Sequence, residues 1–271
     1  MPLRSTTCIV GWSRTMAGDS FTRIRLAAQV RHQGILLLRE PGPLIGYTVM
    51  PLLLIAVLRP MFQAIDHLHA ASTLTGTGQA AAGMAVMFSI FAMKAVGASM
   101  LEERTWNTWD RLRATPAHSG QLLLGKALPL LVTLIAQQFF LFGFAITMFG
   151  LRPASNWWAL VGTTVVWSTC VLLLGTAASS LIRSPAQLSA CGDVAAVLTT
   201  ILAGALVPTT LLPGWLQHLG PVSPGHWAMR GYEAALIDGN AKAIVGPLAA
   251  LAVFGALGIG LGALFSHRSG G

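Results

Sequence analysis

The sequence predicts an all-α integral membrane protein with six transmembrane helices. Of its 271 residues, 54% are hydrophobic and 10% are charged, and the mean hydropathy is +0.66. A soluble domain of this size cannot bury that much apolar surface. The apolar residues fall in six continuous runs, each long enough for the roughly 20 residues that a helix needs to cross a bilayer. A transmembrane β-barrel would need alternating apolar and polar residues, so helices are the predicted structure.

The chain is expected to divide into a cytoplasmic N-terminal segment, residues 1–43, and a six-helix membrane domain, residues 44–271. In the first segment, Phe21–Leu38 carries apolar residues with arginines between them, as a basic helix lying on the membrane surface would. A disordered tail is the alternative, and no signal peptide is expected. The six spans have approximate bounds of Leu44–Phe62, Ala80–Leu101, Leu122–Phe149, Trp157–Ile182, Leu188–Leu206 and Ile244–Phe265.

The distribution of positive charges predicts the side of the membrane that each loop occupies. With the N-terminus in the cytoplasm, 12 of the 17 Lys and Arg residues lie on the inner side, 4 on the outer side and 1, Lys94, inside a span. Cytoplasmic loops carry an excess of positive charge, so both termini are expected in the cytoplasm. The net charge of +8 is then explained by contact with anionic membrane lipids, and no nucleic acid is predicted as a partner.

Two charged side chains are expected inside the membrane. Lys94 lies about seven residues from the inner end of the second span, and Asp193 about six from the inner end of the fifth. At 1.5 Å per residue, both lie roughly 10 Å deep. An unpaired charge toward the membrane centre costs about 3 kcal/mol on insertion scales, which favours an ion pair within one subunit or across a dimer. Alternatively, Lys94 extends to the headgroups and Asp193 is solvated at the start of its helix.

One dense cluster of charges, Glu102–Pro116, separates the second and third spans. Trp106, Trp109 and Leu112 recur in it at helical spacing and form one stripe. Pro116 ends the expected helix, because the residue before a proline avoids the helical region. Since Trp and Arg dominate interface hot spots, this short helix is predicted to dock onto a soluble partner. The alternative is that its tryptophans anchor the chain at the membrane surface.

The external segment Val207–Lys242 is too polar to cross the membrane. Two short helices are expected there, Pro213–Leu219 and Pro224–Ile237, the second with Ser223 as its N-cap. Large side chains from both are predicted to dip into the outer leaflet and form a lid, although simple interfacial anchoring fits the same pattern. These side chains are Trp215, Trp227, Met229 and Tyr232.

Two patterns that would suggest other chemistry are rejected. Gly120–Ala127 has the G-x-x-x-x-G-K spacing of a nucleotide-binding loop, but a membrane span follows it, and alanine stands where magnesium needs Ser or Thr. The cysteines Cys8, Cys170 and Cys191 are scattered, so neither a disulfide framework nor a metal site is predicted. The histidines of the membrane domain fall in loops or at span ends, and no set of nucleophile, base or metal ligands points to an enzyme.

The charged segment resembles the cytoplasmic coupling segment of type-2 ATP-binding-cassette (ABC) exporter permeases. The family's pattern Glu-Arg-x-x-x-Thr-(Trp/Leu)-(Asp/Glu)-Arg-Leu-x-(Ala)-(Ser/Thr)-Pro is matched by Glu103, Arg104, Thr108, Trp109, Asp110, Arg111, Leu112, Ala114, Thr115 and Pro116. Arg39–Pro43 resembles the family's entry segment, and Leu212–Trp215 with Val222–Ala228 resembles its external segment. The resemblance covers nearly the whole chain and points toward the bacterial drug and antibiotic exporter branch.

The resemblance implies a permease subunit of the bacterial inner membrane that binds no cofactor and has no nucleotide site of its own. Such permeases pair with a second copy or a homologue, and each coupling helix sits in a groove of a cytoplasmic ATPase subunit, which holds ATP and Mg²⁺. Trp106, Trp109 and Leu112 would fill that groove. The register would be set by ion pairs from Glu103, Arg104, Asp110, Arg111 and Arg113.

The expected cargo is a hydrophobic or amphipathic drug, antibiotic or lipid-like molecule, moved outward with the energy of ATP hydrolysed by the partner. Within transport, the alternative is a permease for a lipid-linked glycan, which would need a wide channel. In a different class, the alternatives are an ATP-independent channel and a membrane-bound enzyme. Neither of these would need an ATPase partner.

Overall fold

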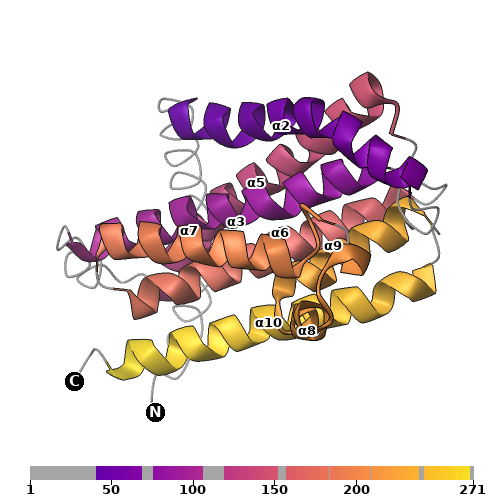
Figure 1. Cartoon of the computed structure of the whole chain (residues 1–271). Coiled ribbons are helices and arrows are strands. Elements are labelled where there is room, and N and C mark those ends of the chain that lie inside the picture. Colours follow the sequence, from indigo (N-terminus) through magenta and orange to yellow (C-terminus); the bar gives the residue numbers. More distant parts are fainter. Residues whose placement is uncertain are drawn as a thin grey trace, which may run out of the picture.

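The computed structural model describes residues 41–68, 76–105, 119–151, 157–182, 184–207, 209–237 and 241–268. Within these ranges every regular element is a helix, and six long helices run broadly alongside one another (Figure 1). The predicted all-α class is confirmed. The long helices are α2 (Pro41–Leu68), α3 (Gly76–Thr105), α5 (Ser119–Phe149), α6 (Trp157–Leu181), α7 (Pro185–Leu202) and α10 (Ala241–Arg268).

The length and composition of these helices suit a membrane. Five of them contain a stretch of at least 18 residues that is apolar enough to cross a bilayer, and α2 contributes a shorter apolar stretch, Thr48–Ala64. The helix ends lie within about four residues of the predicted span ends, except that α2 was expected to end at Phe62 and continues to Leu68. The fifth span was expected to reach Leu206, but α7 ends at Leu202. Two residues later, Gly204 has a φ of 70°, a left-handed conformation that glycine adopts without strain and that commonly ends a helix.

Helix α3 lies at the centre of the bundle. It packs against α2, α5, α6 and α7 and also against the external helix α9 (Pro224–Leu236). Ala80–Val86, in the N-terminal half of α3, is completely or almost completely buried. Its small side chains allow neighbouring helices to approach closely, which is how helices associate where lipid and core are equally apolar.

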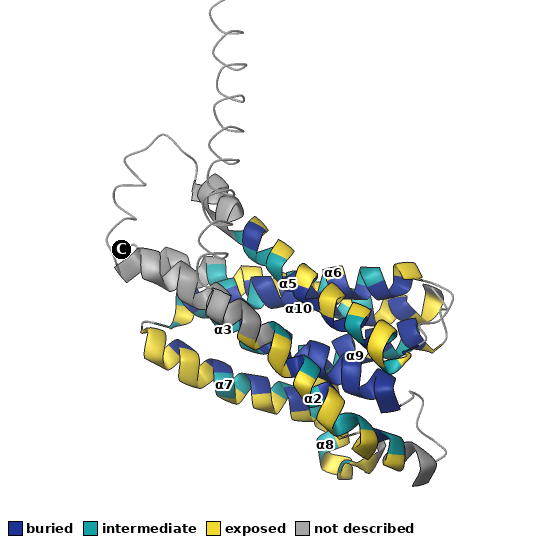
Figure 2. Cartoon of the chain, turned by 90° about the horizontal axis from the view of Figure 1, so that it is seen from above, coloured by how far each residue is buried: buried dark blue, intermediate teal, exposed yellow. Residues whose placement is uncertain are grey.

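The external segment folds back onto the bundle instead of lying free. It consists of η1 (Thr209–Leu211), α8 (Gly214–Leu219), η2 (Gly220–Val222) and α9. Helices α8 and α9 match the two predicted short helices to within about one residue at each end. Helix α9 packs against α3, α6, α7 and α10, and Figure 2 shows it largely in the dark blue of buried residues. Ser223 does occupy the N-cap position of α9, but its side chain makes no capping hydrogen bond.

The turn between α7 and η1 is held against α3. Gln79 Nε2 donates a 2.6 Å hydrogen bond to the carbonyl oxygen of Gly204. The backbone of Ala205 lies so close to Gly83 that a Cβ on this glycine would sit 2.9 Å from the Ala205 carbonyl carbon. The C-terminal end of α7 and the turn that follows it are therefore fixed to the most buried helix.

Candidate functional site

An ion pair links α3 to α7. Lys94 Nζ contacts the carboxylate of Asp193, so the structure brings together the two intramembrane charges predicted from the sequence, and it does so within one subunit. The Lys94 side chain is 20% exposed and that of Asp193 is 50% exposed. The amine also lies 5.2 Å from the ring centroid of Phe91, a distance typical of a cation–π contact.

A glycine on α7 makes room for this ion pair. A Cβ on Gly192 would lie 2.6 Å from Cγ and 2.8 Å from Cδ of Lys94. The aliphatic part of the lysine therefore lies across the face of α7 next to the carboxylate that it contacts. Asp193 is the next residue after Gly192, so one short stretch of α7 provides both the space and the partner for the lysine.

The predicted coupling segment begins where α3 ends. Glu103 and Arg104 belong to the last turn of α3, and the structure does not describe their side chains. The rest of the predicted set lies outside the described residues, so its helix and its role stay predictions. These residues are Trp106, Trp109, Asp110, Arg111, Leu112 and Arg113.

The stretch that mimics a nucleotide-binding loop is part of a helix. Helix α5 begins at Ser119 and continues without a break through Gly120–Lys126 into the third span. A phosphate-binding loop needs non-helical backbone whose N–H groups point at the phosphates, so this local structure does not provide one. Among the described residues, no group of three or more His, Cys, Asp or Glu side chains is arranged to hold a metal.

The four predicted lid residues separate into two groups. Trp215, on α8, is 66% exposed, and Trp227 is partly buried and donates a 2.9 Å hydrogen bond from Nε1 to the Pro221 carbonyl. Met229 and Tyr232 are 2% and 0% exposed, which corrects the expectation that they dip into the outer leaflet.

Met229 and Tyr232 are buried because they lie on the face of α9 that packs against the bundle. The buried residues of this helix recur at intervals of three and four, so they form one stripe that faces the bundle. Tyr232 packs against α5, with its ring centroid 5.0 Å from that of Phe142. The buried positions are Gly225, Ala228, Met229, Gly231, Tyr232, Ala235 and Leu236.

Polar side chains between the helices were not singled out by the sequence reasoning. Gln138 Nε2, on α5, donates to the Ala85 carbonyl at 2.9 Å and to the Ser89 hydroxyl, both on α3. Polar groups in lipid must be satisfied within the protein, so this amide fixes α5 to the central helix. The sequence did indicate such a contact, because Gln138 is one of two adjacent glutamines in the middle of an otherwise apolar span.

Two ionisable groups of α9 are perturbed by their surroundings. Burial, aided by the positive charge of Arg230, lowers the pKa of His226. Burial raises the pKa of the Glu233 carboxyl, although Arg230 opposes this shift. His226 is therefore more readily neutral, and Glu233 more readily protonated, than each would be in water.

Most of the chain, all of the described helices except α10, matches a known family. The model of the family described as ABC-2 type transporter matches residues 26–237, which include α2, α3, α5, α6, α7 and the external segment. The chain belongs to the ABC-2 type transporter family. It is therefore a multi-pass membrane protein of the permease type, and the resemblance to this family predicted from the sequence is confirmed.

Curated relatives of this ABC-2 protein have names that describe resistance and drug transport. The linearmycin resistance permease protein LnrN of Bacillus subtilis (strain 168) is 24% identical over 173 residues, which cover 60% of this chain and 42% of the relative. The probable multidrug ABC transporter permease YbhR of Escherichia coli (strain K12) is 26% identical over 141 residues, 52% of this chain and 38% of the relative. The aligned part thus covers less than half the length of these relatives.

Proposed function

We propose that this chain is the permease subunit of a bacterial ABC exporter and that a separate cytoplasmic ATPase drives it through residues 102–116. The main support for this proposal is that α3, the central helix of a chain of this family, leads into the charged segment. This helix is buried among α2, α5, α6, α7 and α9, and its last turn leads directly into the charged segment. A displacement of that segment would be passed to every one of these neighbours.

The Lys94–Asp193 ion pair is well placed to carry part of this movement. Thr105, the last residue of α3, is 11 residues beyond Lys94, which corresponds to about 16 Å of helix at 1.5 Å per residue. A continuous helix transmits a push over that length, and the ion pair would pull α7 along with α3. An ATPase can bias such a permease only by binding its conformations unequally, so the docking contacts must differ between the inward-facing and outward-facing states.

The proposed substrate is a hydrophobic or amphipathic drug, antibiotic or lipid-like molecule. The names of the relatives support this class, since one describes linearmycin resistance and the other multidrug transport. A second permease chain, either a copy or a homologue, completes the proposed transporter. The proposed orientation has both termini and the charged segment in the cytoplasm, and the uneven distribution of positive charge between the loops supports it.

The proposal is tested by co-purification with an ATPase encoded beside this chain, followed by measurement of drug-stimulated ATP hydrolysis and of transport in vesicles. In the double variant Trp109→Ala with Arg111→Glu, we expect transport and drug stimulation to fall at least tenfold while the permease remains folded. The matched control is Trp158→Ala, because Trp158 is 82% exposed. It lies in the first turn of α6, at the end of the bundle opposite to the C-terminal end of α3.

Two results would contradict the proposal in different ways. Normal coupling in the double variant would show that residues 102–116 are not the docking site. Solute movement by the chain without any ATPase would identify a channel or a carrier, and the ABC assignment of its activity would be wrong.

A further inference from the structure

Four polar side chains are buried in the interior of the bundle on two neighbouring helices, and we call them the internal polar cluster. Three lie on α6, Thr164, Trp167 and Ser168, and the fourth is Tyr232 on α9. Thr164 is 1% exposed and the other three are 0% exposed. Their polar atoms, Thr164 Oγ1, Trp167 Nε1, Ser168 Oγ and Tyr232 Oη, have no hydrogen-bond partner among the described residues.

The cluster differs from the other hydroxyl groups of α6. A Ser or Thr in a helix commonly donates to a carbonyl three or four residues earlier, and Thr163, Thr169, Thr176, Ser179 and Ser180 all do so. Thr164 and Ser168 do not. These two residues are four apart, so their hydroxyl groups lie one above the other on the same face of the helix.

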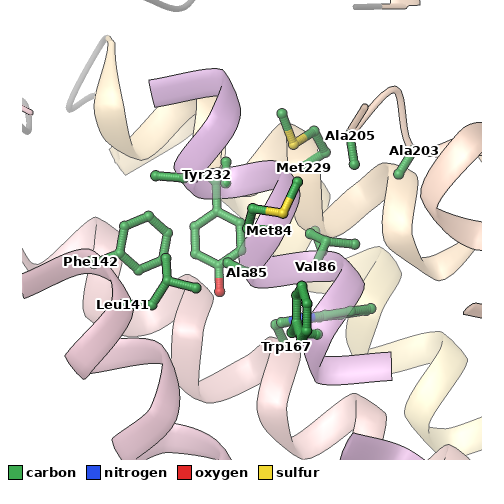
Figure 3. Close-up of a cluster of buried hydrophobic side chains, with 14 of the residues drawn as sticks. Met84, Ala85, Val86, Leu141, Phe142, Trp167, Ala203, Ala205, Met229 and Tyr232 are labelled. Atoms are coloured by element: carbon green, nitrogen blue, oxygen red, sulfur yellow. The ribbon is translucent and has the colours of Figure 1, made fainter. Parts of the chain in front are cut away.

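The aromatic members of the cluster point into the same region. Figure 3 shows Tyr232 projecting from α9 into the bundle, with its hydroxyl at the end toward Trp167. The Tyr232 hydroxyl lies beside the Thr164 side chain, and neither group has another hydrogen-bond partner among the described residues. Polar groups of α6 and α9 thus face each other where Tyr232 lies beside Thr164.

The depth of the cluster makes unpaired polar groups expensive. Thr164 and Ser168 are 7 and 11 residues beyond Trp157, the first residue of α6, which places them about 10–17 Å along the helix, near the middle of a bilayer. A polar group without a partner in such surroundings costs on the order of several kcal/mol. Four such groups together require a partner that is small and that both donates and accepts hydrogen bonds.

We propose that the internal polar cluster is a binding site for ordered water, which bridges α6 to α9 inside the membrane. Water suits the cluster because a buried water typically makes about three hydrogen bonds to groups that lack partners. The indole N–H can only donate, whereas the three hydroxyl groups both donate and accept, so one or two waters can satisfy all four side chains. A substrate hydroxyl is not the ligand that we propose, because the cluster is closed to the surface.

Hydroxyl-radical footprinting of the full chain in lipid nanodiscs tests this proposal. Synchrotron X-rays produce radicals from bound water in place, so an aromatic ring beside an ordered water is oxidised even when it is fully buried. We expect Tyr232 and Trp167 to react at least tenfold faster than Phe62, after correction for intrinsic reactivity. Phe62 is the matched control, because it is 1% exposed and belongs to the hydrophobic core.

A variant locates the groups that hold the water. The double substitution Thr164→Val with Ser168→Ala removes two hydroxyl groups with little change in volume, and we expect it to lower the oxidation rate of Tyr232 at least threefold. Thr169→Val is the control, because the Thr169 hydroxyl already donates to the Val165 carbonyl. That control should leave the rate unchanged.

Each outcome decides the question. Fast oxidation of Tyr232 and Trp167 that falls in the double variant supports the water site. Oxidation of both wild-type rings at the rate of Phe62 would overturn it, whether or not the variant folds. Fast oxidation that persists in the double variant would show that Thr164 and Ser168 are not the ligands.

Discussion

The packing of α3 against the turn after α7 predicts a reversal of the usual effect of a glycine substitution. Alanine in place of a glycine inside a helix normally stabilises the protein by about 1 kcal/mol, because alanine has less conformational freedom to lose on folding. Gly83→Ala should do the opposite. Its Cβ would lie 2.9 Å from the carbonyl carbon and 3.2 Å from Cα of Ala205, and backbone atoms cannot move aside as the end of a flexible side chain can.

The size of the effect follows from opposing contributions. Forcing one extra methyl group into a closely packed site costs roughly 1–3 kcal/mol. The displaced turn would also strain the buried hydrogen bond from Gln79 to Gly204, which is 2.6 Å long and contributes about 1 kcal/mol. After subtraction of the helix-propensity gain, Gly83→Ala should destabilise the protein by about 1–3 kcal/mol. Gly143→Ala is the control, because nothing lies within 4 Å of its Cβ position, and it should be neutral or stabilise the protein by up to about 1 kcal/mol.

Thermal unfolding of the two variants in the same nanodiscs measures this difference. A gap of about 1–4 kcal/mol between them should appear as a melting temperature at least about 2 °C lower for Gly83→Ala, taking about 2 °C per kcal/mol for a chain of this size. If Gly83→Ala melts as high as Gly143→Ala, the turn is not held against α3 as described. The anchoring of the external segment to the central helix would then be wrong.

Two further predictions concern charged groups. Lys94→Met leaves the Asp193 carboxylate without its partner and should destabilise the protein by about 1–2 kcal/mol, less than for a fully buried pair because Asp193 is 50% exposed. In a double-mutant cycle, adding Asp193→Asn should recover about half of that loss, and additive effects would show that the contact contributes nothing. Because the pKa of His226 is lowered on folding, the unfolded chain binds a proton more readily, so stability is complete above about pH 6.5 and falls as the pH drops through the folded-state pKa. The melting temperature should therefore decrease more between pH 7.5 and pH 5.5 in the wild type than in His226→Gln, and equal decreases would contradict the assignment.

The sequence predicted what depends on the length and continuity of apolar runs. The six long helices follow directly from the need to cross a bilayer with every backbone group satisfied. The pairing of Lys94 with Asp193 could be predicted because both charges are at similar depth, and a charge in lipid needs a partner. The end of α7 could not be predicted from the sequence, because Leu202–Leu206 is as apolar as the helix before it. Only the left-handed backbone at Gly204 ends the helix there.

The burial of Tyr232 was predicted wrongly for a related reason. Tyrosine and tryptophan in a short external helix normally mark the membrane surface, and the sequence does not say which face of that helix meets protein. The structure places Tyr232 against Phe142 and leaves Trp215 outside, so one aromatic pattern describes both an anchor and a core residue. The internal polar cluster was missed because its α6 members are ordinary residues of an apolar span, and only the positions of their polar atoms set them apart.

The burial of the helices also explains why hydrophobicity is a poor guide to the centre of this protein. In the spanning part of α3, 83% of the residues are buried, against 22% for the corresponding part of the more apolar α10. In water the most apolar helix would be the most buried, but in a bilayer lipid solvates leucine and valine as well as a protein core does. Close packing and polar contacts then decide which helix lies inside. Helix α3 is central because its alanines and Gly83 allow close contact and its Gln79 and Ser89 form hydrogen bonds with its neighbours. A substitution that makes this stretch more hydrophobic, such as Ala82→Leu, should therefore weaken the bundle.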